Sequence, residues 1–416
     1  MRIALYHHAV PGGTKRHLYE IAKQMKKEGH FLGFFRPSTE CDSFLPVDPY
    51  LDVNKIYPSK PYRRWNARLP LLRKYLDLIK LKLYLEHMKK LSREIAADID
   101  SGNFDFVFLL HGQPVQSTYL LRYLKTPSIY YCAEPVRALF EPQTPGFAQK
   151  KEMSLPGKCS QVWYQPANRI RAQLLKRDAI ENARHAALLL TNSHYSLEYI
   201  YKAYGIRVQV SYLGVDEKVF SPQPCEKEHA VLTVGRLSPL KGQDFVIQAL
   251  GLLPQELRPA LYMVSDSCDE NSRNFLSKLA EINKVEIKFF INIPDEELVT
   301  LYNRVKAFVY APIREPFGLV ILEAMACGTP VIGVQEGGAG ELLKDGINGF
   351  IRPREVKKFS EVIEFVLRNK ELAETIGRNA RNEILKFWTW GHAYQRMMVY
   401  VQGLSEIKNQ ALGTSR

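Results

Sequence analysis

Ten short apolar runs, spaced along the whole chain and separated by stretches of helical pattern, limit most strongly what this sequence can fold into. Most of them are continuous rather than alternating, as in strands buried on both faces of a parallel sheet. They lie at 3–6, 106–110, 128–132, 187–191, 208–212, 231–234, 261–264, 287–290, 307–310 and 330–334. Ten such strands exceed one core, whereas 416 residues can fill two. The sequence therefore predicts an α/β protein with two doubly wound, Rossmann-like domains.

The division between these domains is predicted within residues 205–228. Glycines and prolines cluster there beside a polar stretch, before a new strand begins: Gly205, Gly214, Pro222 and Pro224. We therefore expect one domain over residues 1–210 and a second over 211–390. A last helix over 391–416 is expected to return to the first domain.

The net charge of +13 is carried entirely by the first half of the sequence. Residues 1–222 contain 33 Lys and Arg against 20 Asp and Glu, whereas residues 223–416 contain 24 of each. Residues 55–93 alone hold twelve basic side chains and two acidic ones. Such a concentration of positive charge favours an anionic partner: nucleic acid, a membrane surface or a phosphorylated substrate. We exclude nucleic acid because no module with stacking aromatic side chains is visible.

Part of this basic stretch is predicted to form a long helix over residues 69–95. Two apolar stripes run along it: Leu72, Leu76, Ile79 and Leu83, and Leu78, Leu81, Leu85 and Met88. Because the two stripes nearly encircle the helix, one interpretation is that it packs into the protein. The other is that it attaches to an anionic membrane surface.

Signals for export or membrane insertion are not visible in the sequence. The first residues lack a long apolar region, and no 18 consecutive residues are apolar. The six cysteines are scattered without a C-x-x-C pair, which indicates reduced thiols rather than disulfides or a zinc site. We expect a cytoplasmic protein, with a peripheral position on the inner face of the membrane as an alternative.

The densest chemical signal is the segment 315–332, which reads E-P-F-G-L-V-I-L-E-A-M-A-C-G-T-P-V-I. The proline after Glu315 keeps that carboxylate in a loop, and Gly318 and Leu319 then open a helix. Free backbone N–H groups at such a helix start bind anions. Glu323 follows about one and a half turns later. Along the chain, a carboxylate comes first, then N–H groups that can donate to phosphate, and then a second carboxylate. A nucleotide sugar offers hydroxyl, phosphate and hydroxyl groups in the same order.

A second loop follows the predicted strand at 231–234 and reads G-R-L-S-P-L-K-G from Gly235 onward. It places two cations at the carboxyl end of a strand, where open α/β sheets bind ligands. Arg236 can hold phosphate oxygens bidentately, and Lys241 is a compact positive charge.

Together these loops resemble the GT-B glycosyltransferases of family 4, the glycosyltransferases group 1. That family carries a G-R-x-x-x-x-K-G loop and an E-x7-E motif, which are matched here at 235–242 and 315–323. Further matches are Asn192-Ser193, Gly214-Val215-Asp216, Phe220, Gly338 with Glu341, Asp345-Gly346, Asn348-Gly349 and Trp390. In the first half, Gly12-Gly13 followed by Arg16-His17 stands where the family has a glycine-rich loop. The resemblance is dense over 186–395 and sparse before it.

The resemblance implies a GT-B architecture, with two doubly wound domains facing across a cleft, and a retaining, metal-independent hexosyltransferase. Its donor would be a GDP- or UDP-linked sugar, its acceptor a glycan or a lipid-linked molecule, and it would need no cofactor. Arg236 and Lys241 would hold the diphosphate, Glu315 the hexose hydroxyls and Glu323 the ribose. The remaining donor-binding residues would be Gly12, Gly13, Gly235, Phe317, Gly318, Leu319 and Val320.

Two segments depart from the family pattern. Many relatives have a histidine in a segment like Y-Y-C-H-E-P, where this chain has Ala133. Either Glu134 or His111 is therefore a candidate for the acceptor side of the cleft, and the alternative is that both are structural. The usual glycine-rich V-G-x-G is replaced by V-S-D-S at 264–267, which leaves base recognition open.

Other patterns are interpreted as structural. Asp98-Ile99-Asp100 resembles a metal-binding D-x-D, but it closes a helix, so we expect a solvated or capping role. His7-His8 lacks a third ligand and is expected to be an ordinary loop pair, so no metal site is predicted. A glycosidase pair made by Glu315 and Glu323 is disfavoured by the adjoining cation loop. Alternative functions are a non-catalytic sugar-nucleotide-binding protein, and a GT-B epimerase or hydrolase.

Overall fold

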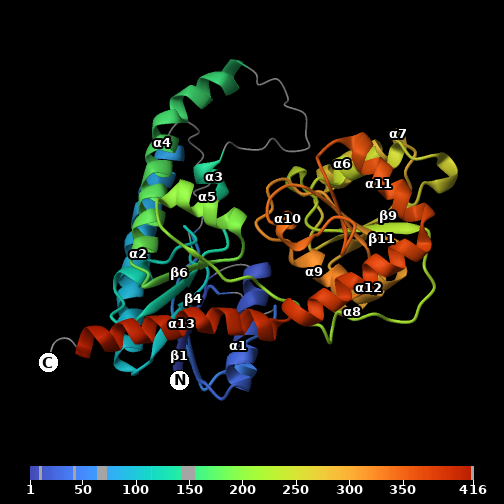
Figure 1. Ribbon diagram of the computed structural model, residues 1–416. Coiled ribbons are helices and arrows are strands. Elements are labelled where there is room, and N and C mark those ends of the chain that lie inside the picture. Colours follow the sequence, from blue (N-terminus) through green and yellow to red (C-terminus); the bar gives the residue numbers. More distant parts are fainter. Residues whose placement is uncertain (9–11, 41–43, 63–72, 114, 142–154, 414–416) are drawn as a thin grey trace.

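Two parallel β-sheets organise the chain in a computed structural model, which describes residues 1–8, 12–40, 44–62, 73–113, 115–141 and 155–413 (Figure 1). The first sheet has the strand order β3-β2-β1-β4-β5-β6-β7. Its strands are β1 (Arg2–Tyr6), β2 (Phe31–Pro37), β3 (Val53–Tyr57), β4 (Phe106–Leu109), β5 (Ser128–Tyr131), β6 (Leu188–Thr191) and β7 (Gln209–Val210). The second has the order β10-β9-β8-β11-β12-β13. Its strands are β8 (Ala230–Val234), β9 (Ala260–Ser265), β10 (Ile287–Ile291), β11 (Ala307–Tyr310), β12 (Val331–Val334) and β13 (Phe350–Arg352).

Helices cover both sheets. Those of the first part of the chain are α1 (Gly13–Lys27), α2 (Arg73–Ser101), α3 (Arg137–Phe140), α4 (Leu155–Arg184) and α5 (His194–Tyr204). Those of the second part are α6 (Gln243–Gly251), α7 (Glu270–Ile282), α8 (Asp295–Arg304), α9 (Leu319–Ala326), α10 (Ala339–Leu342), α11 (Val356–Arg368), α12 (Lys370–Phe387) and α13 (Trp390–Gly413). In the described part of the chain, none of the helices combines the length and apolarity that crossing a membrane requires.

All ten predicted strands are present, with ends that differ by up to two residues, and the sheets contain three more. β3 escaped prediction because it is an edge strand with four of its five residues exposed, so it carries no apolar run. β2 is interrupted by Gly33, which pairs with Ala4 of β1, and β13 is only three residues long. Helix α4 was also not predicted.

Both sheets run outward in two directions from a central pair of strands. The order reverses between β1 and β4 in the first sheet and between β8 and β11 in the second. In open parallel sheets, ligands bind at the carboxyl ends of the strands that flank such a reversal. The segment that ends β1 contains His7 and His8, β4 leads to His111, and β8 leads to Gly235.

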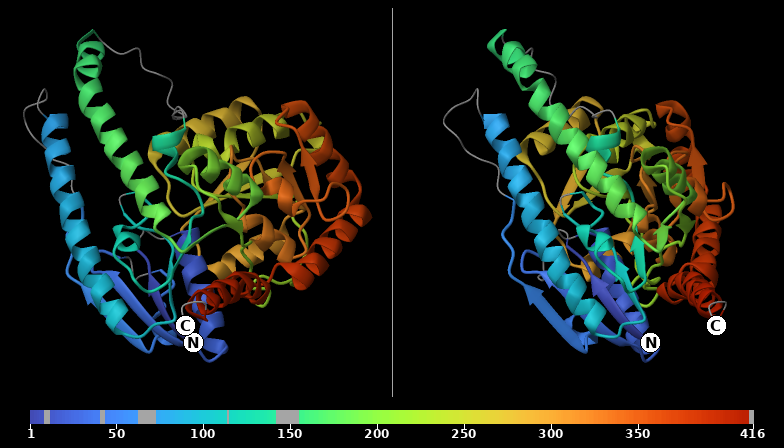
Figure 2. Two further views of the ribbon diagram at one scale, coloured as in Figure 1. Left: turned by 60° about the vertical axis from the view of Figure 1, so that its left-hand side comes forward. Right: turned by 90° about the vertical axis from the view of Figure 1, so that its left-hand side faces the viewer.

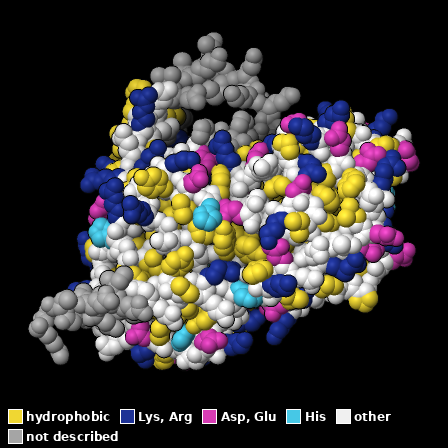
Figure 3. Space-filling view, in the orientation of Figure 1, with side chains coloured by type: hydrophobic (Ala, Val, Ile, Leu, Met, Phe, Trp, Pro, Cys, Tyr) yellow, Lys and Arg dark blue, Asp and Glu magenta, His cyan; other side chains and the backbone are white. Residues whose placement is uncertain are grey.

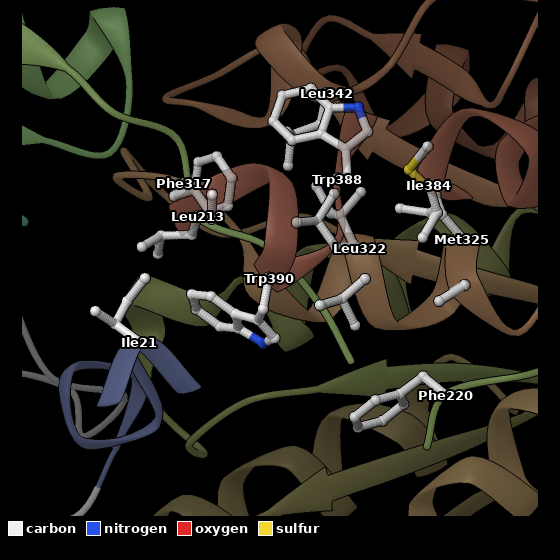
Figure 4. Packing of buried hydrophobic residues seen from close by; sticks show 14 of the residues in the cluster. Ile21, Leu213, Phe220, Phe317, Leu322, Met325, Leu342, Ile384, Trp388 and Trp390 are labelled. Carbon is white, nitrogen blue, oxygen red and sulfur yellow. The ribbon is translucent and has the colours of Figure 1, made fainter. Parts of the chain in front are cut away.

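The last helix, α13, lies against the first sheet's half of the molecule (Figure 1). Trp390 stacks on His17 of α1 with ring centroids 5.8 Å apart, and Tyr394 is hydrogen-bonded to His30 at 2.7 Å. Figure 4 shows Trp390 near Ile21 of α1 and near Leu322 of α9. One apolar cluster therefore joins α1 and α13 to α9 and links the two halves of the molecule.

The helix predicted over residues 69–95 is α2, of which residues from 73 onward are described. Its stripe Leu78, Leu81, Leu85 and Met88 is buried. The other stripe is not, because Ile79 is 56% exposed and Leu83 is 66% exposed. The expectation that apolar residues pack nearly all round this helix is therefore wrong. Leu72 lies outside the described residues.

Candidate active site

The two predicted catalytic loops of the second sheet meet through an ion pair. The ammonium of Lys241 lies 2.9 and 2.8 Å from the two carboxylate oxygens of Glu315. Their side chains are 28% and 22% exposed, so the pair is reached by solvent. The loop after β8 thus supplies the cation and the loop after β11 supplies the carboxylate.

Glycine allows these loops to approach each other. Gly242 has a φ of +67°, and a Cβ atom there would lie 1.8 Å from the carbonyl oxygen of Ala311. Gly337 is equally constrained, because its Cβ would lie 2.1 Å from the carbonyl oxygen of Glu315. The neighbouring Gly338 donates its N–H to that same carbonyl at 2.8 Å. The glycine loop after β12 therefore holds the backbone of Glu315 in place.

Helix α9 begins at Leu319, four residues after Glu315. Gly318 precedes its first residue with a φ of +105°, and the N–H groups of Leu319 and Val320 lie in the first turn. The Phe317 side chain is buried against Tyr212, with ring centroids 6.2 Å apart. Phe317 therefore anchors the helix start, and its side chain is turned into the core.

Glu323 lies inside the protein, where its carboxylate accepts a hydrogen bond from the Tyr302 hydroxyl at 3.1 Å. Burial raises the pKa of Glu323, and the nearby Arg16 opposes that shift. Arg16 itself forms a bidentate pair with Asp295, at 3.0 and 2.9 Å. Arg16, Leu319, Glu323 and Trp390 line a small cavity.

The glycine-rich loop of the first half reaches the start of α9. A Cβ atom on Gly13 would lie 3.5 Å from Leu319 Cδ1. Gly12, with a φ of +151°, precedes it, and Arg16 lies in the first turn of α1. The start of α1 therefore faces the start of α9 across the space between the sheets.

Glu134 also reaches this region from the first half. Its carboxylate pairs with Arg137 at 2.6 Å, and Arg137 donates to the carbonyl oxygens of Ile313 and Arg314 in the loop before Glu315. Burial raises the pKa of Glu134; Arg137 and Lys241 lower it, and Glu315 adds to the rise. Two carboxylates and two cations are therefore brought together from opposite sides.

The histidines of the first sheet form a separate group. His7 and His8 are buried rather than being ordinary loop residues, and the Nδ1 of His7 lies 2.7 Å from Glu40, which also pairs with Lys15. Burial lowers the pKa of His111 to about 4, so this side chain is neutral at neutral pH. Among the described residues, no cluster of three or more His, Cys, Asp or Glu could hold a metal ion.

Arg236 does not take part in the Lys241–Glu315 ion pair. Its side chain is 63% exposed, and its guanidinium lies 3.2 Å from the carboxylate of Asp266, in the segment that departs from the family's V-G-x-G pattern. Gly235, which precedes it, packs against the Lys241 side chain, since its Cβ would lie 3.3 Å from Cδ. Both predicted phosphate-binding cations are thus paired with carboxylates.

Two cationic side chains at this site were not assigned from the sequence. Arg137 is the first residue of the short helix α3, whereas Glu134 lies in the loop before that helix, so no helical spacing indicated the pair. Arg16 was noted only as part of a motif, and its partner Asp295 is 279 residues away. In the D-x-D segment, Asp100 accepts hydrogen bonds from the N–H groups of Lys125 and Thr126 in the loop before β5, which is a structural role.

Comparison with known proteins finds a family match over the second half of the chain. Residues 194–383 match the family model "Glycosyl transferases group 1". The chain is 29% identical to the putative glycosyltransferase YtcC of Bacillus subtilis over 44% of this chain and 48% of that protein. It is 26% identical to a D-inositol 3-phosphate glycosyltransferase of Jonesia denitrificans over 55% of this chain and 59% of that protein. It thus spans about half the length of the curated relatives it matches.

Solved structures extend the likeness to the first half. Anabaena Alr3699/HepE, solved with UDP and glucose, superposes with a TM-score of 0.68 at 20% identity, over 97% of this chain and 100% of that one. This likeness shows the fold, so the expected GT-B architecture is confirmed. Residues 194–383 therefore match the model of the glycosyl transferases group 1 family, within a chain that has the GT-B fold.

Proposed function

We propose that this chain transfers a hexosyl group from a nucleotide diphosphate sugar to a hydroxyl of an acceptor, with retention of anomeric configuration and without a metal ion. The observation that carries the proposal is the Lys241–Glu315 pair at the start of α9, facing Glu134 and Arg137 of the other half. It provides cations for a diphosphate and carboxylates for sugar hydroxyls on both sides of one site. The bound UDP and glucose of the Anabaena protein support this choice of donor class.

In this proposal, the diphosphate of the donor binds at the start of α9. Backbone N–H groups of Leu319 and Val320 bind its oxygens, because a helix start carries a partial positive charge. Lys241 then exchanges the Glu315 carboxylate for phosphate, and Arg236 does the same with Asp266. Glu315 is thereby released to accept hydrogen bonds from the hexose, and the buried Glu323 accepts those of the ribose.

In the proposed reaction, the bond from the anomeric carbon to the phosphate oxygen breaks and its electron pair stays on the diphosphate. The acceptor oxygen bonds to the anomeric carbon from the same face, and its proton passes to the departing phosphate oxygen. Negative charge on that oxygen increases toward the transition state. Cations fixed beside it bind the transition state more strongly than the ground state, which raises kcat.

The acceptor is assigned to the first half, and an anionic or lipid-linked acceptor fits it best. The exposed Ile79 and Leu83 of α2 lie on one helix face beside the exposed lysines Lys82 and Lys90. Apolar side chains flanked by lysines suit the surface of an anionic membrane. Figure 2 shows α2 and α4 extending together from the first sheet, away from the second. The D-inositol 3-phosphate glycosyltransferases among the relatives support a phosphorylated acceptor.

The test measures nucleotide diphosphate release with and without acceptors. A panel of nucleotide sugars is first screened for stabilisation of the fold, since a bound donor raises Tm by mass action. The stabilising donor is then assayed with glycan and lipid-linked acceptors. Release that requires an acceptor supports the transferase. Release without one indicates a hydrolase, and stabilisation without any release indicates a binding protein.

A further inference from the structure

A large pocket opens in the first half of the molecule, apart from the candidate active site. It has a volume of about 820 Å³ and lies where β2 and β3 end, beside α2. Its wall combines two tyrosines, two lysines and a histidine: Tyr62, Tyr84, Lys60, Lys80 and His87. None of the described residues that line it carries a carboxylate.

The two tyrosines form a fixed aromatic surface. Their ring centroids lie 5.4 Å apart with the planes inclined by 48°. The Tyr62 hydroxyl donates to the carbonyl oxygen of Asp77 at 3.4 Å and accepts from Arg171 of α4 at 3.3 Å. Hydrogen bonds from two helices therefore hold the Tyr62 ring, so this surface exists before any ligand arrives.

The polar side of the pocket is positively charged and contains an unused hydroxyl. Lys80, Tyr84 and His87 recur at the spacing of one helix face, distinct from the buried face and from the face of Ile79 and Leu83. Among the described residues, the buried Ser59 hydroxyl has no hydrogen-bond partner, although its backbone N–H donates to Ser38 at 2.9 Å. A buried hydroxyl without a partner is costly, and a ligand oxygen relieves that cost.

The pocket opens on the same sheet edge as the active site. Neighbouring strands lie about 4.8 Å apart, and β3 is two strands from β1 and four from β5, which leads to Glu134. Roughly 10–20 Å therefore separates this pocket from the reacting centre. A ligand bound in it cannot be the hydroxyl that is glycosylated, but it can be a remote part of the same acceptor.

We propose that this pocket binds a phosphate-bearing sugar unit of the acceptor, remote from the hydroxyl that receives the hexose. The tyrosine rings contact the apolar face of the sugar, and Lys60, Lys80 and His87 surround its phosphate. The proposal rests on the proposed transferase function, which it extends by naming the acceptor chemistry. It requires that the acceptor carry a phosphate some distance from its reactive end.

Isothermal titration calorimetry of the full chain with glucose 6-phosphate, glucose and inorganic phosphate tests the proposal. We expect glucose 6-phosphate to bind more tightly than either part alone. Lys60→Glu should weaken its binding by about tenfold, since the reversed charge faces the phosphate. His87→Glu, which also changes an exposed side chain, should act in the same direction.

Two matched variants separate this site from others. Lys90→Glu makes the same charge change on the exposed outer face of α2 and should leave the affinity within about twofold, since the exposed charge is screened. Lys241→Ala removes the donor-site cation and should also leave it unchanged. Any one of three results overturns the proposal. The Lys60 and Lys90 variants bind equally well, Lys241→Ala loses binding, or glucose 6-phosphate binds no more tightly than phosphate.

Donor stabilisation provides the independent readout. Lys60→Glu should keep the same rise in Tm with the nucleotide sugar as the unchanged chain. Absence of that rise in the unchanged chain rejects the proposed function, whatever the pocket binds. Vesicles that carry a phosphoinositide headgroup, compared with the soluble sugar phosphate, then distinguish a lipid-borne unit from a free one: tighter binding to the vesicles assigns the lipid, and equal binding assigns the soluble sugar phosphate.

Discussion

The two halves of this molecule share one architecture but encode their binding surfaces differently. The second half places its functional groups on short glycine-bounded loops, where Lys241 and Glu315 are fixed by backbone contacts at Gly242 and Gly337. The first half uses long helices and carries the whole excess of positive charge. Figure 3 shows Lys and Arg side chains gathered at the left-hand side of the molecule. Its pocket is formed by residues of a loop and of α2 that carry no recognisable motif.

The difference shows which kind of site a sequence can reveal. A diphosphate is well bound by backbone N–H groups at a helix start and by fixed cations, and this arrangement leaves spaced glycines and charges in the sequence. An acceptor surface is a matter of side chains on helix faces, and many residue combinations serve equally well. Four predictions test the contrast between the halves.

The largest effect is expected in the second half. Lys241→Ala should lower kcat by about 10²–10³, or roughly 2.7–4 kcal/mol, because a preorganised cation beside the leaving oxygen is lost. Steady-state kinetics with saturating donor measures it. Lys288→Ala, which removes an exposed lysine from β10, is the control and should change little. A kcat for Lys241→Ala within about threefold of the unchanged chain contradicts the role.

The next effect lies in the first half, at Glu20 of α1. Burial raises the pKa of this carboxyl to about 7, although Lys23 opposes the shift. The folded state therefore binds more protons than the unfolded state between about pH 4.5 and 7, and this group's contribution to stability falls as pH rises through that range. Glu20→Gln should remove this loss and gain about 1–3 kcal/mol at pH 8 relative to pH 5.

Urea unfolding of both chains at the two pH values measures this difference. Glu28→Gln, at the exposed end of the same helix, is the matched control and should leave the pH dependence as it is. An identical pH dependence in Glu20→Gln and the unchanged chain means that this carboxyl is not protonated in the fold.

A smaller effect is expected on the outer face of α2. If that face binds an anionic membrane, Lys82→Glu should weaken co-sedimentation with anionic vesicles by about 1 kcal/mol, or roughly fivefold, with less effect as salt increases. Lys288→Glu, on the second half, should have no effect. Equal binding to neutral and anionic vesicles would show that charge in the first half is not what attracts a surface.

The smallest expected effect is that of a chelator. Turnover after dialysis against excess EDTA should remain within about twofold, because Lys241 and Arg236 neutralise the leaving group without a metal. A loss that Mg²⁺ or Mn²⁺ restores would assign that role to an ion instead.

Much of the fold follows from the sequence, because a strand buried on both faces must be continuously apolar. This is why β1 and β4 were predicted and the exposed edge strand β3 was not. Of the candidate site, the loops of Lys241 and Glu315 were predicted through their motifs. Their mutual ion pair was not, because no spacing reveals which charge a side chain meets without its ligand. The Arg16–Asp295 pair joins helices α1 and α8 from the two halves of the molecule and has no local signal at all.

The Lys241–Glu315 pair also bears on how a turnover ends. Under the proposed mechanism, the hydroxyls of the bound hexose occupy Glu315 and leave Lys241 to the diphosphate. Once the hexose has been transferred, Glu315 has lost those partners and competes again for the ammonium 2.8 Å away. The nucleotide product then competes with a carboxylate for Lys241, whereas the intact donor did not have to. Under the proposed mechanism, the protein's own side chain therefore hastens departure of the nucleotide and limits product inhibition.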